Sequence, residues 1–262
     1  MTASPDITRW LEALHTRHVA PYRPQEFTRA LRALSARYVE RRSELAERSA
    51  LDSAGKRSAF AAFYAPIHYL TVREIVNALP DRARQVSQIT DLGCGTGVCA
   101  AAWQHAVPRA VGIVGVDMSQ WALEEAKWNW RALGVGGKAK RGDLVAEVPV
   151  VRVRPGAAPP TPAVRPNPPA LLLAWAVNEL PREAREALLP ALLGFDGQVL
   201  IIEPLARGAA PWWREWATAF AGVGGRADEW KFAVDLPPMI SELSSRAGFH
   251  REYLGARSLW KD

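Results

Sequence analysis

The residues most suited to chemistry by type and spacing lie in the segment TDLGCGTG, which follows a short apolar run and precedes a helix-like stretch. The segment combines one carboxylate, Asp91, with three glycines at alternating positions, Gly93, Gly95 and Gly97. Glycines at a strand-to-helix turn allow a sharp bend and let the backbone approach a ligand without an intervening Cβ. The segment therefore predicts a ligand-binding loop.

The spacing and charge of this loop indicate the kind of ligand. A dinucleotide-binding loop has the pattern G-x-G-x-x-G, but the sixth position counted from Gly93 is Val98. Asp91 would also repel a diphosphate, whereas it would attract the ammonium and sulfonium groups of S-adenosylmethionine. We therefore expect S-adenosylmethionine as the cofactor.

Two further carboxylates stand at the ends of predicted strands. Asp117 ends the apolar run IVGVD, 22 residues after Gly95, where a carboxylate can bind both hydroxyls of a ribose. Asp143 in RGDL follows a weaker strand and is expected to hold the adenine amino group. The alternatives are that Asp117 caps the next helix and that Asp143 is a turn residue.

The elements that position these residues follow a regular order. From Gln88 onward, short apolar runs alternate with helical patterns, which predicts an α/β fold with a Rossmann-like, mostly parallel sheet flanked by helices. Residues 1–85 read as a helical N-terminal cap, and 86–262 as the Rossmann-like domain. Within the latter, 149–169 holds eight prolines and predicts an extended loop. Pro66 either kinks its helix or starts a new one, and the tail HREYLGARSLW supplies one strand or two.

Further candidates lie where the fourth and fifth predicted strands end. In AWAVNELP we expect Trp175 beside the cofactor and Asn178 and Glu179 as catalytic residues, although the last two could instead cap the following helix. Glu203, which ends the fifth strand, is expected to contact the substrate.

Aromatic and histidine side chains add candidates for the acceptor side. From the cap, Tyr64 and His68 are expected to reach the substrate, the alternative for His68 being a buried, hydrogen-bonded ring. A group of C-terminal tryptophans is expected either to pack in the core or to stack on an aromatic acceptor: Trp212, Trp213, Trp216 and Trp230.

These features resemble the class I S-adenosylmethionine-dependent methyltransferases over residues 88 to about 205. A narrower resemblance, to the methyltransferase-like proteins associated with the small ribosomal subunit, rests on AFAAFYAPIHYLTVREIV, NELP and IIEP. The broader family implies a seven-stranded sheet, with the three glycines lining the methionine and ribose, Asp117 the ribose, and Met118, Asp143 and Leu144 the adenine. The narrower group carries a C-terminal cysteine cluster, but this chain has only Cys94 and Cys99, so no metal is predicted.

Composition and charge bound the remaining possibilities. No run of about 18 apolar residues and no secretory signal is present, which predicts a cytoplasmic protein without a membrane partner. Residues 1–85 hold 14 Lys and Arg against 9 Asp and Glu, a surplus of 5 out of a total net charge of +6. This Arg-rich segment favours methylation of RNA or a ribosomal component. The alternatives are methylation of a small aromatic metabolite and a cofactor-binding assembly factor without turnover.

Overall fold

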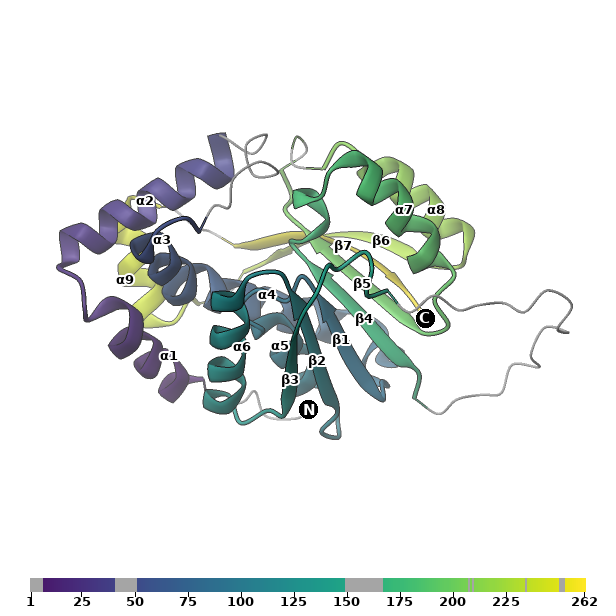
Figure 1. Ribbon diagram of the computed structural model, residues 1–262, viewed down its shortest axis with the longest axis horizontal. Helices are drawn as coiled ribbons and strands as arrows, with labels where there is room; N and C mark the ends of the chain where they lie inside the picture. Colours follow the sequence, from purple (N-terminus) through teal and green to yellow (C-terminus); the bar gives the residue numbers. More distant parts are fainter. Residues whose placement is uncertain are drawn as a thin grey trace, which may run out of the picture.

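The sheet is the frame of the molecule. The computed structural model describes residues 7–40, 51–148, 167–206, 208, 210–233, 235–249 and 253–262. Seven strands form one sheet in the order β3-β2-β1-β4-β5-β7-β6 (Figure 1). β7 runs antiparallel to β5 and β6, and the pairs among the other strands are parallel. This confirms the predicted Rossmann-like sheet. The strands are β1 Gln88–Leu92, β2 Gly112–Asp117, β3 Gly137–Arg141, β4 Pro169–Ala174, β5 Gln198–Glu203, β6 Arg226–Phe232 and β7 Leu254–Lys261.

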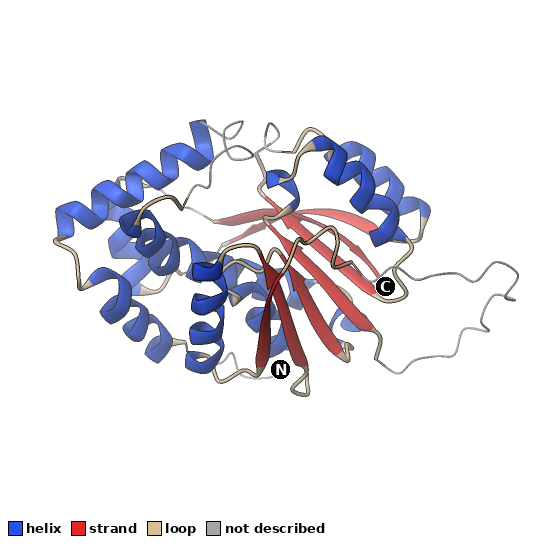
Figure 2. Cartoon of the chain, in the orientation of Figure 1, coloured by secondary structure: helices blue, strands red, loops and turns tan. Residues whose placement is uncertain are grey.

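Helices cover both faces of the sheet and extend beyond one of them (Figure 2). One face carries α4 Ala65–Ala78, α5 Val98–Ala106 and α6 Gln120–Ala132, and the other carries α7 Arg182–Leu193 and α8 Trp213–Gly222. The outer group contains α1 Thr8–Leu14, a π-helical stretch His15–Val19, α2 Pro24–Glu40, α3 Ala54–Ala59, the π-helical turn Phe60–Tyr64 and α9 Pro238–Ala247. The described residues also include two short 3₁₀ turns, Asp81–Arg84 and Val177–Glu179.

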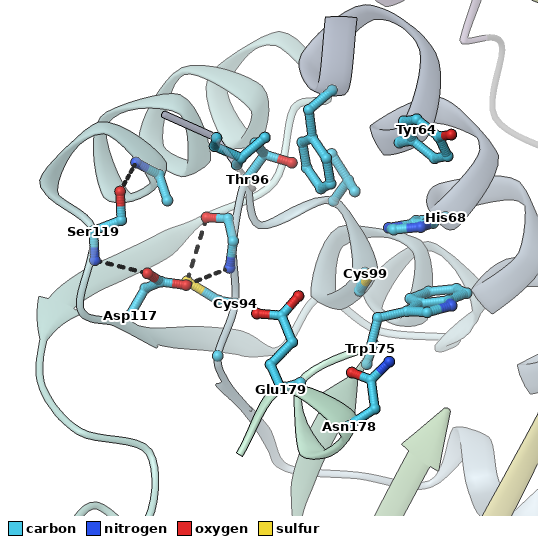
Figure 3. Close-up of a pocket in the computed structure, with 18 of the residues that line it drawn as sticks. Tyr64, His68, Cys94, Thr96, Cys99, Asp117, Ser119, Trp175, Asn178 and Glu179 are labelled. Atoms are coloured by element: carbon cyan, nitrogen blue, oxygen red, sulfur yellow. Dashed lines mark hydrogen bonds between the residues drawn. The ribbon is translucent and has the colours of Figure 1, made fainter. Parts of the chain in front are cut away.

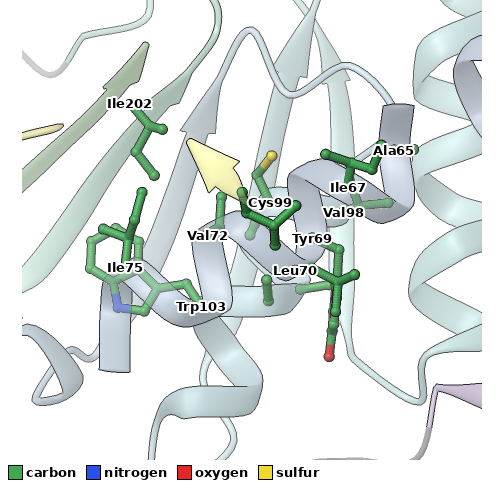
Figure 4. Packing of buried hydrophobic residues seen from close by; sticks show 14 of the residues in the cluster. Ala65, Ile67, Tyr69, Leu70, Val72, Ile75, Val98, Cys99, Trp103 and Ile202 are labelled. Atoms are coloured by element: carbon green, nitrogen blue, oxygen red, sulfur yellow. The ribbon is translucent and has the colours of Figure 1, made fainter. Parts of the chain in front are cut away.

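Burial on both faces explains the continuous apolar character of the central strands. In β4, Leu171 and Leu173 pack in the cluster with α7 and α8, whereas Leu172 packs in the cluster with α4 and α5. Figure 4 shows α4 lying against α5, with Trp103 buried among apolar side chains. The strand ends that carry the candidate residues are therefore held by a core on each side.

Two long-range hydrogen bonds connect the outer helices to the loop after β1. The indole Nε1 of Trp10 in α1 donates to Asn129 Oδ1 in α6 at 2.8 Å. The amide Nδ2 of Asn129 donates in turn to the backbone oxygen of Thr96 at 3.0 Å. Both bonds are buried, so the position of α1 is linked to the shape of the glycine-rich loop.

Several sequence-based expectations about elements are corrected or decided. Pro169 is the first residue of β4, where a missing N–H is tolerated, so the predicted loop ends earlier; 149–166 lies outside the described residues. The tail HREYLGARSLW supplies one strand, β7, and the neighbouring strand β6 comes from RADEWKF. Pro66 lies in the first turn of α4, directly after the π-helical turn.

The boundary between cap and Rossmann-like domain after residue 85 stays a prediction. Although α4 belongs to the predicted cap by sequence, it packs on α5 and on β7 as part of a layer over the sheet. No helix in the described part of the chain has both the length and the apolarity needed to cross a bilayer.

Candidate active site

A cavity of about 790 Å³ lies at the carboxyl ends of β1, β2 and β4. The chain runs from β1 outward through β2 and β3 and then returns to place β4 on the other side of β1. Open α/β sheets bind ligands at such a reversal of strand order. Side chains from α2, α3, the π-helical turn and α4 close the cavity opposite the sheet (Figure 3). The volume is within the range of small-molecule and cofactor sites.

The glycines of the glycine-rich loop serve two purposes: Gly93 and Gly95 line the cavity, and Gly97 lets α6 pack closely. All three adopt positive φ, and the backbone N–H of Gly93 donates to Val116 O in β2 at 2.9 Å. A Cβ on Gly95 would meet no atom within 4 Å, so this residue faces open cavity space. A Cβ on Gly97 would lie 2.7 Å from Trp130 Nε1. Gly93 and Gly95 line the cavity, whereas Gly97 lies outside the lining and allows α6 to pack against the loop.

Asp117 holds the loop and faces the cavity. Its Oδ2 accepts the backbone N–H of Gly95 at 2.9 Å, and its Oδ1 accepts that of Ser119 at 2.8 Å (Figure 3). Ser119, rather than Asp117, is the N-cap of α6, since its Oγ accepts the N–H of Ala122. Each carboxylate oxygen of Asp117 keeps capacity for another hydrogen bond. Met118, which is 58% exposed, follows it on the cavity wall.

Besides Gly97, two more of the expected cofactor residues, Asp91 and Asp143, lie outside the cavity lining. Asp143 uses Oδ1 to accept the N–H groups of Val145 and Ala146, which is the turn role considered as its alternative. Its neighbour Leu144 does line the cavity. Asp91 is 1% exposed and lies beneath the loop, where burial raises its pKa to about 7. Asp91 therefore does not face the cavity, where contact with the cofactor had been expected.

The turn after β4 brings Asn178 and Glu179 to the cavity (Figure 3). The carboxylate of Glu179 is exposed to the cavity but surrounded by protein, and this limited hydration, together with the nearby Asp117, raises its pKa to about 7. Glu203 does not reach the cavity. It is fully buried, its pKa is raised by burial to about 8, and its Oε1 accepts the N–H of Asn178 at 3.1 Å. Glu203 therefore positions the turn, where direct substrate contact had been expected.

Aromatic side chains form the opposite wall and meet the sheet at one point. Phe60, Tyr64 and His68 line the cavity from the π-helical turn and α4. The ring of His68 stacks on Trp175 with a centroid distance of 3.8 Å and an interplanar angle of 7°. Trp175 has φ 56°, the one positive φ of a non-glycine residue in the described chain. Strained backbone and π-helical turns both recur at functional sites.

Three buried polar atoms on residues that line the cavity have no hydrogen-bond partner in the described part of the chain: Arg57 Nε, Thr96 Oγ1 and Asn178 Oδ1. Buried polar groups are nearly always paired in native proteins, so such atoms at a cavity indicate a polar ligand. Sequence reasoning found Asn178 but missed Arg57 and Thr96. Thr96 stands inside the glycine motif, whereas no motif marks Arg57.

The C-terminal tryptophans do not contribute to this cavity. Trp212 and Trp216 are buried in the cluster beneath α8, and Trp230 donates to Ser258 Oγ at 2.8 Å. The packing alternative thus holds for these side chains. The aromatic residues that face the cavity come mainly from the N-terminal half.

One family model agrees with this fold. The family model for the methyltransferase small domain matches residues 72–153. No curated protein shows significant sequence similarity to the chain. Among solved structures, a putative O-methyltransferase from Nostoc punctiforme is 15% identical, with 91% of this chain and 72% of that chain covered and a TM-score of 0.49.

Two further structures show the same distant likeness. Magnesium protoporphyrin IX methyltransferase from Synechocystis, with bound S-adenosylhomocysteine, is 14% identical, with 84% and 91% covered and a TM-score of 0.45. A ribosomal protein methylase from Lactobacillus delbrueckii is 14% identical, with 74% and 76% covered and a TM-score of 0.38. Together with the strand order, the family-model match assigns the chain a Rossmann-like fold of the methyltransferase type.

Proposed function

We propose that the protein is an S-adenosylmethionine-dependent methyltransferase. The observation that carries this proposal is the composition of one cavity at the strand-order reversal. There Gly95, which has no Cβ, leaves space above the loop, and Asp117 stands at the end of β2. Three buried polar atoms of the lining also lack a hydrogen-bond partner in the described part of the chain. A dinucleotide site is disfavoured because the loop lacks the last glycine of the G-x-G-x-x-G pattern, where Val98 stands instead.

The lining residues fit the parts of the cofactor in order. Asp117 would accept hydrogen bonds from the ribose hydroxyls, while Met118 and Leu144 would enclose the adenine. The carboxylate of Glu179 and Oδ1 of Asn178 would face the positively charged end. When bound, S-adenosylmethionine supplies a methyl carbon that takes the acceptor's electron pair as its carbon–sulfur bond breaks.

The protein's contribution is mainly orientation. Holding acceptor and methyl group in line converts an encounter into a unimolecular step, which supplies roughly 7–11 kcal/mol in favourable cases. Ionised Glu179 attracts the cation and is able to take the proton that an O–H or N–H acceptor releases. A carboxyl group with a pKa near neutrality suits that second role.

Two observations favour a small planar acceptor over RNA: the aromatic wall of the cavity, and the pairing of several N-terminal arginines within the protein. The wall facing the sheet is formed by Phe60, Tyr64 and His68, which suits stacking on a flat molecule. Five of the thirteen arginines in residues 1–85 pair within the protein: Arg17 with Glu125, Arg32 with the backbone oxygens of Arg246 and Ala247, Arg73 with Glu74, Arg82 with Asp262 and Arg84 with Asp81.

The test has a binding arm and a turnover arm. Calorimetry should show binding of S-adenosylhomocysteine, and Asp117→Ala should lower that affinity at least tenfold because hydrogen bonds to an ionised group are lost. Transfer of labelled methyl groups to small-molecule extracts, rather than to ribosomal RNA, is expected. Strong salt dependence of RNA binding with RNA labelling would favour the RNA alternative, and cofactor binding without turnover an assembly factor. Binding of a dinucleotide with no binding of S-adenosylhomocysteine would overturn the proposal.

A further inference from the structure

Two side chains that line the cavity, Arg57 and Thr96, offer hydrogen-bond donors, whereas the other charged side chains among its described lining residues are acidic. Arg57 comes from α3, and its guanidinium carbon lies 6.0 Å from the ring centroid of Trp121, near the start of α6. Its Nε is buried and unpaired in the described chain, as is the hydroxyl oxygen of Thr96. Val98 and Cys99, in the first turn of α5, line the same cavity.

These groups share one electrostatic preference. Arg57 is a permanent cation and presents its N–H groups in a fork that matches a carboxylate. The Thr96 hydroxyl donates a hydrogen bond, and the first turn of α5 carries the positive end of a helix dipole. The remaining charged side chains among the described lining residues are Asp117 and Glu179. The lining therefore combines groups that attract an anion with groups that attract a cation.

Arg57 stands at one end of a row of cap residues whose other members are aromatic or histidine side chains. Arg57, Phe60, Tyr64 and His68 follow one another along the continuous helical stretch 54–78, and all line the cavity. At one end of this row Arg57 lies near Trp121 of α6, and at the other His68 stacks on Trp175 at the end of β4. An anionic group of a bound ligand would thus meet Arg57 at the end of this row that lies away from Trp175.

We propose that Arg57 and Thr96 form a carboxylate-binding subsite of this cavity. The inference rests on the proposed function, because a bound cofactor fills the adjoining space. A carboxylate reaches the subsite from one of two sources, the amino-acid end of the cofactor or an acidic group on the acceptor. With a carboxylate from either source bound, Arg57 Nε and the Thr96 hydroxyl would both have a hydrogen-bond partner.

The cofactor source is tested by pairing protein variants with two ligands. S-adenosylhomocysteine carries the amino-acid carboxylate, whereas 5′-methylthioadenosine lacks it. Arg57→Met should lower the affinity for the first at least tenfold and for the second less than threefold, with Thr96→Val acting in the same direction but more weakly. Arg57→Lys should recover part of the loss, since it restores the charge without the fork.

Lys56→Met is the matched control. Lys56 precedes Arg57 on α3 but is paired with Asp52 and is not part of the cavity lining, so its removal should leave both affinities unchanged. Thermal unfolding of each variant checks that the fold persists. Arg57 makes no hydrogen bond through Nε in the described chain, so its melting temperature should stay close to that of the control.

The acceptor source is tested on protein saturated with S-adenosylhomocysteine. There 4-hydroxybenzoate should bind at least tenfold more tightly than 4-hydroxybenzamide, and Arg57→Met should abolish the difference. The inference is overturned if Arg57→Met changes the affinities for S-adenosylhomocysteine and 5′-methylthioadenosine equally and the wild-type protein binds 4-hydroxybenzoate and 4-hydroxybenzamide with equal affinity. Failure of the wild-type protein to bind either nucleoside would instead overturn the proposed function, and the benzoate pair alone would then decide the subsite.

Discussion

The two walls of the cavity differ in what holds their chemistry in place. The sheet wall, formed by the glycine-rich loop, Asp117 and the turn at Asn178 and Glu179, is fixed by backbone hydrogen bonds to strand ends. The cap wall, formed by Arg57, Phe60, Tyr64 and His68, is fixed by side-chain packing of one helical stretch. The shape of the sheet wall is therefore set by the backbone, whereas that of the cap wall depends on which side chains stand along one helical stretch.

The largest expected effect separates two glycines of the sheet wall. Gly97→Ala places a Cβ 2.7 Å from Trp130 Nε1 at φ 73°, so the free energy of unfolding should fall by about 3 kcal/mol, from strain and overpacking together. Gly95→Ala, with open space around its Cβ, should cost about 1 kcal/mol from its positive φ alone. Urea denaturation measures both.

Ligand binding should reverse the ranking of these glycines. A methyl group at Gly95 occupies the space above the loop, so the affinity for S-adenosylhomocysteine should fall at least tenfold in Gly95→Ala. Equal losses of stability in the two variants, or unchanged affinity in Gly95→Ala, would show that the loop is not divided as described.

A second effect depends on pH and on Glu179. Its pKa in the free protein is raised to about 7, so it is half protonated near neutrality. Because the ionised form attracts a cation, binding of S-adenosylmethionine should release a proton, and affinity should fall by up to about tenfold per unit as the pH drops below 7. Above 7 the carboxyl group is already ionised and the affinity should level off.

Calorimetry between pH 5.5 and 7.5 tests this expectation, and Glu179→Gln is the informative variant. It should bind more weakly at pH 7.5 and show a flatter pH dependence. Any pH dependence of affinity that remains in Glu179→Gln would come from the other ionisable groups around the site: Asp91 on β1, Asp117 on β2, Glu203 on β5, Arg57 on α3 and His68 on α4. An identical slope in the variant would assign the proton to one of these groups.

The smallest expected effect concerns the point where the two walls meet. Trp175 combines a positive φ with the stack on His68. Both Trp175→Gly and Trp175→Ala remove the stack, but only glycine relieves the backbone strain. The glycine variant should therefore be more stable than the alanine variant by about 1 kcal/mol in thermal or urea unfolding. Equal stabilities would mean that the backbone at this position is not strained.

The contrast between the walls also explains what the sequence could predict. The alternation of strands and helices and the position of the loop follow from local patterns, since Gly93, Gly95 and Asp117 stand at fixed distances from apolar runs. Asp143 and Glu203 were placed at the correct strand ends, but the direction of each side chain depends on neighbouring backbone N–H groups that a pattern does not reveal. Arg57 could not be found, because its position in the cavity depends on how α3 packs near α6.

The link from Trp10 through Asn129 to Thr96 bears on how this protein can be shortened. Deleting the first helix would leave an amide oxygen of Asn129 without its indole donor inside the core, and the other end of that amide holds the loop at Thr96. An unsatisfied group of this kind costs about 1–3 kcal/mol. A trimmed version that still folds would thus carry a loosened glycine-rich loop, and weak ligand affinity measured on it would reflect the missing helix.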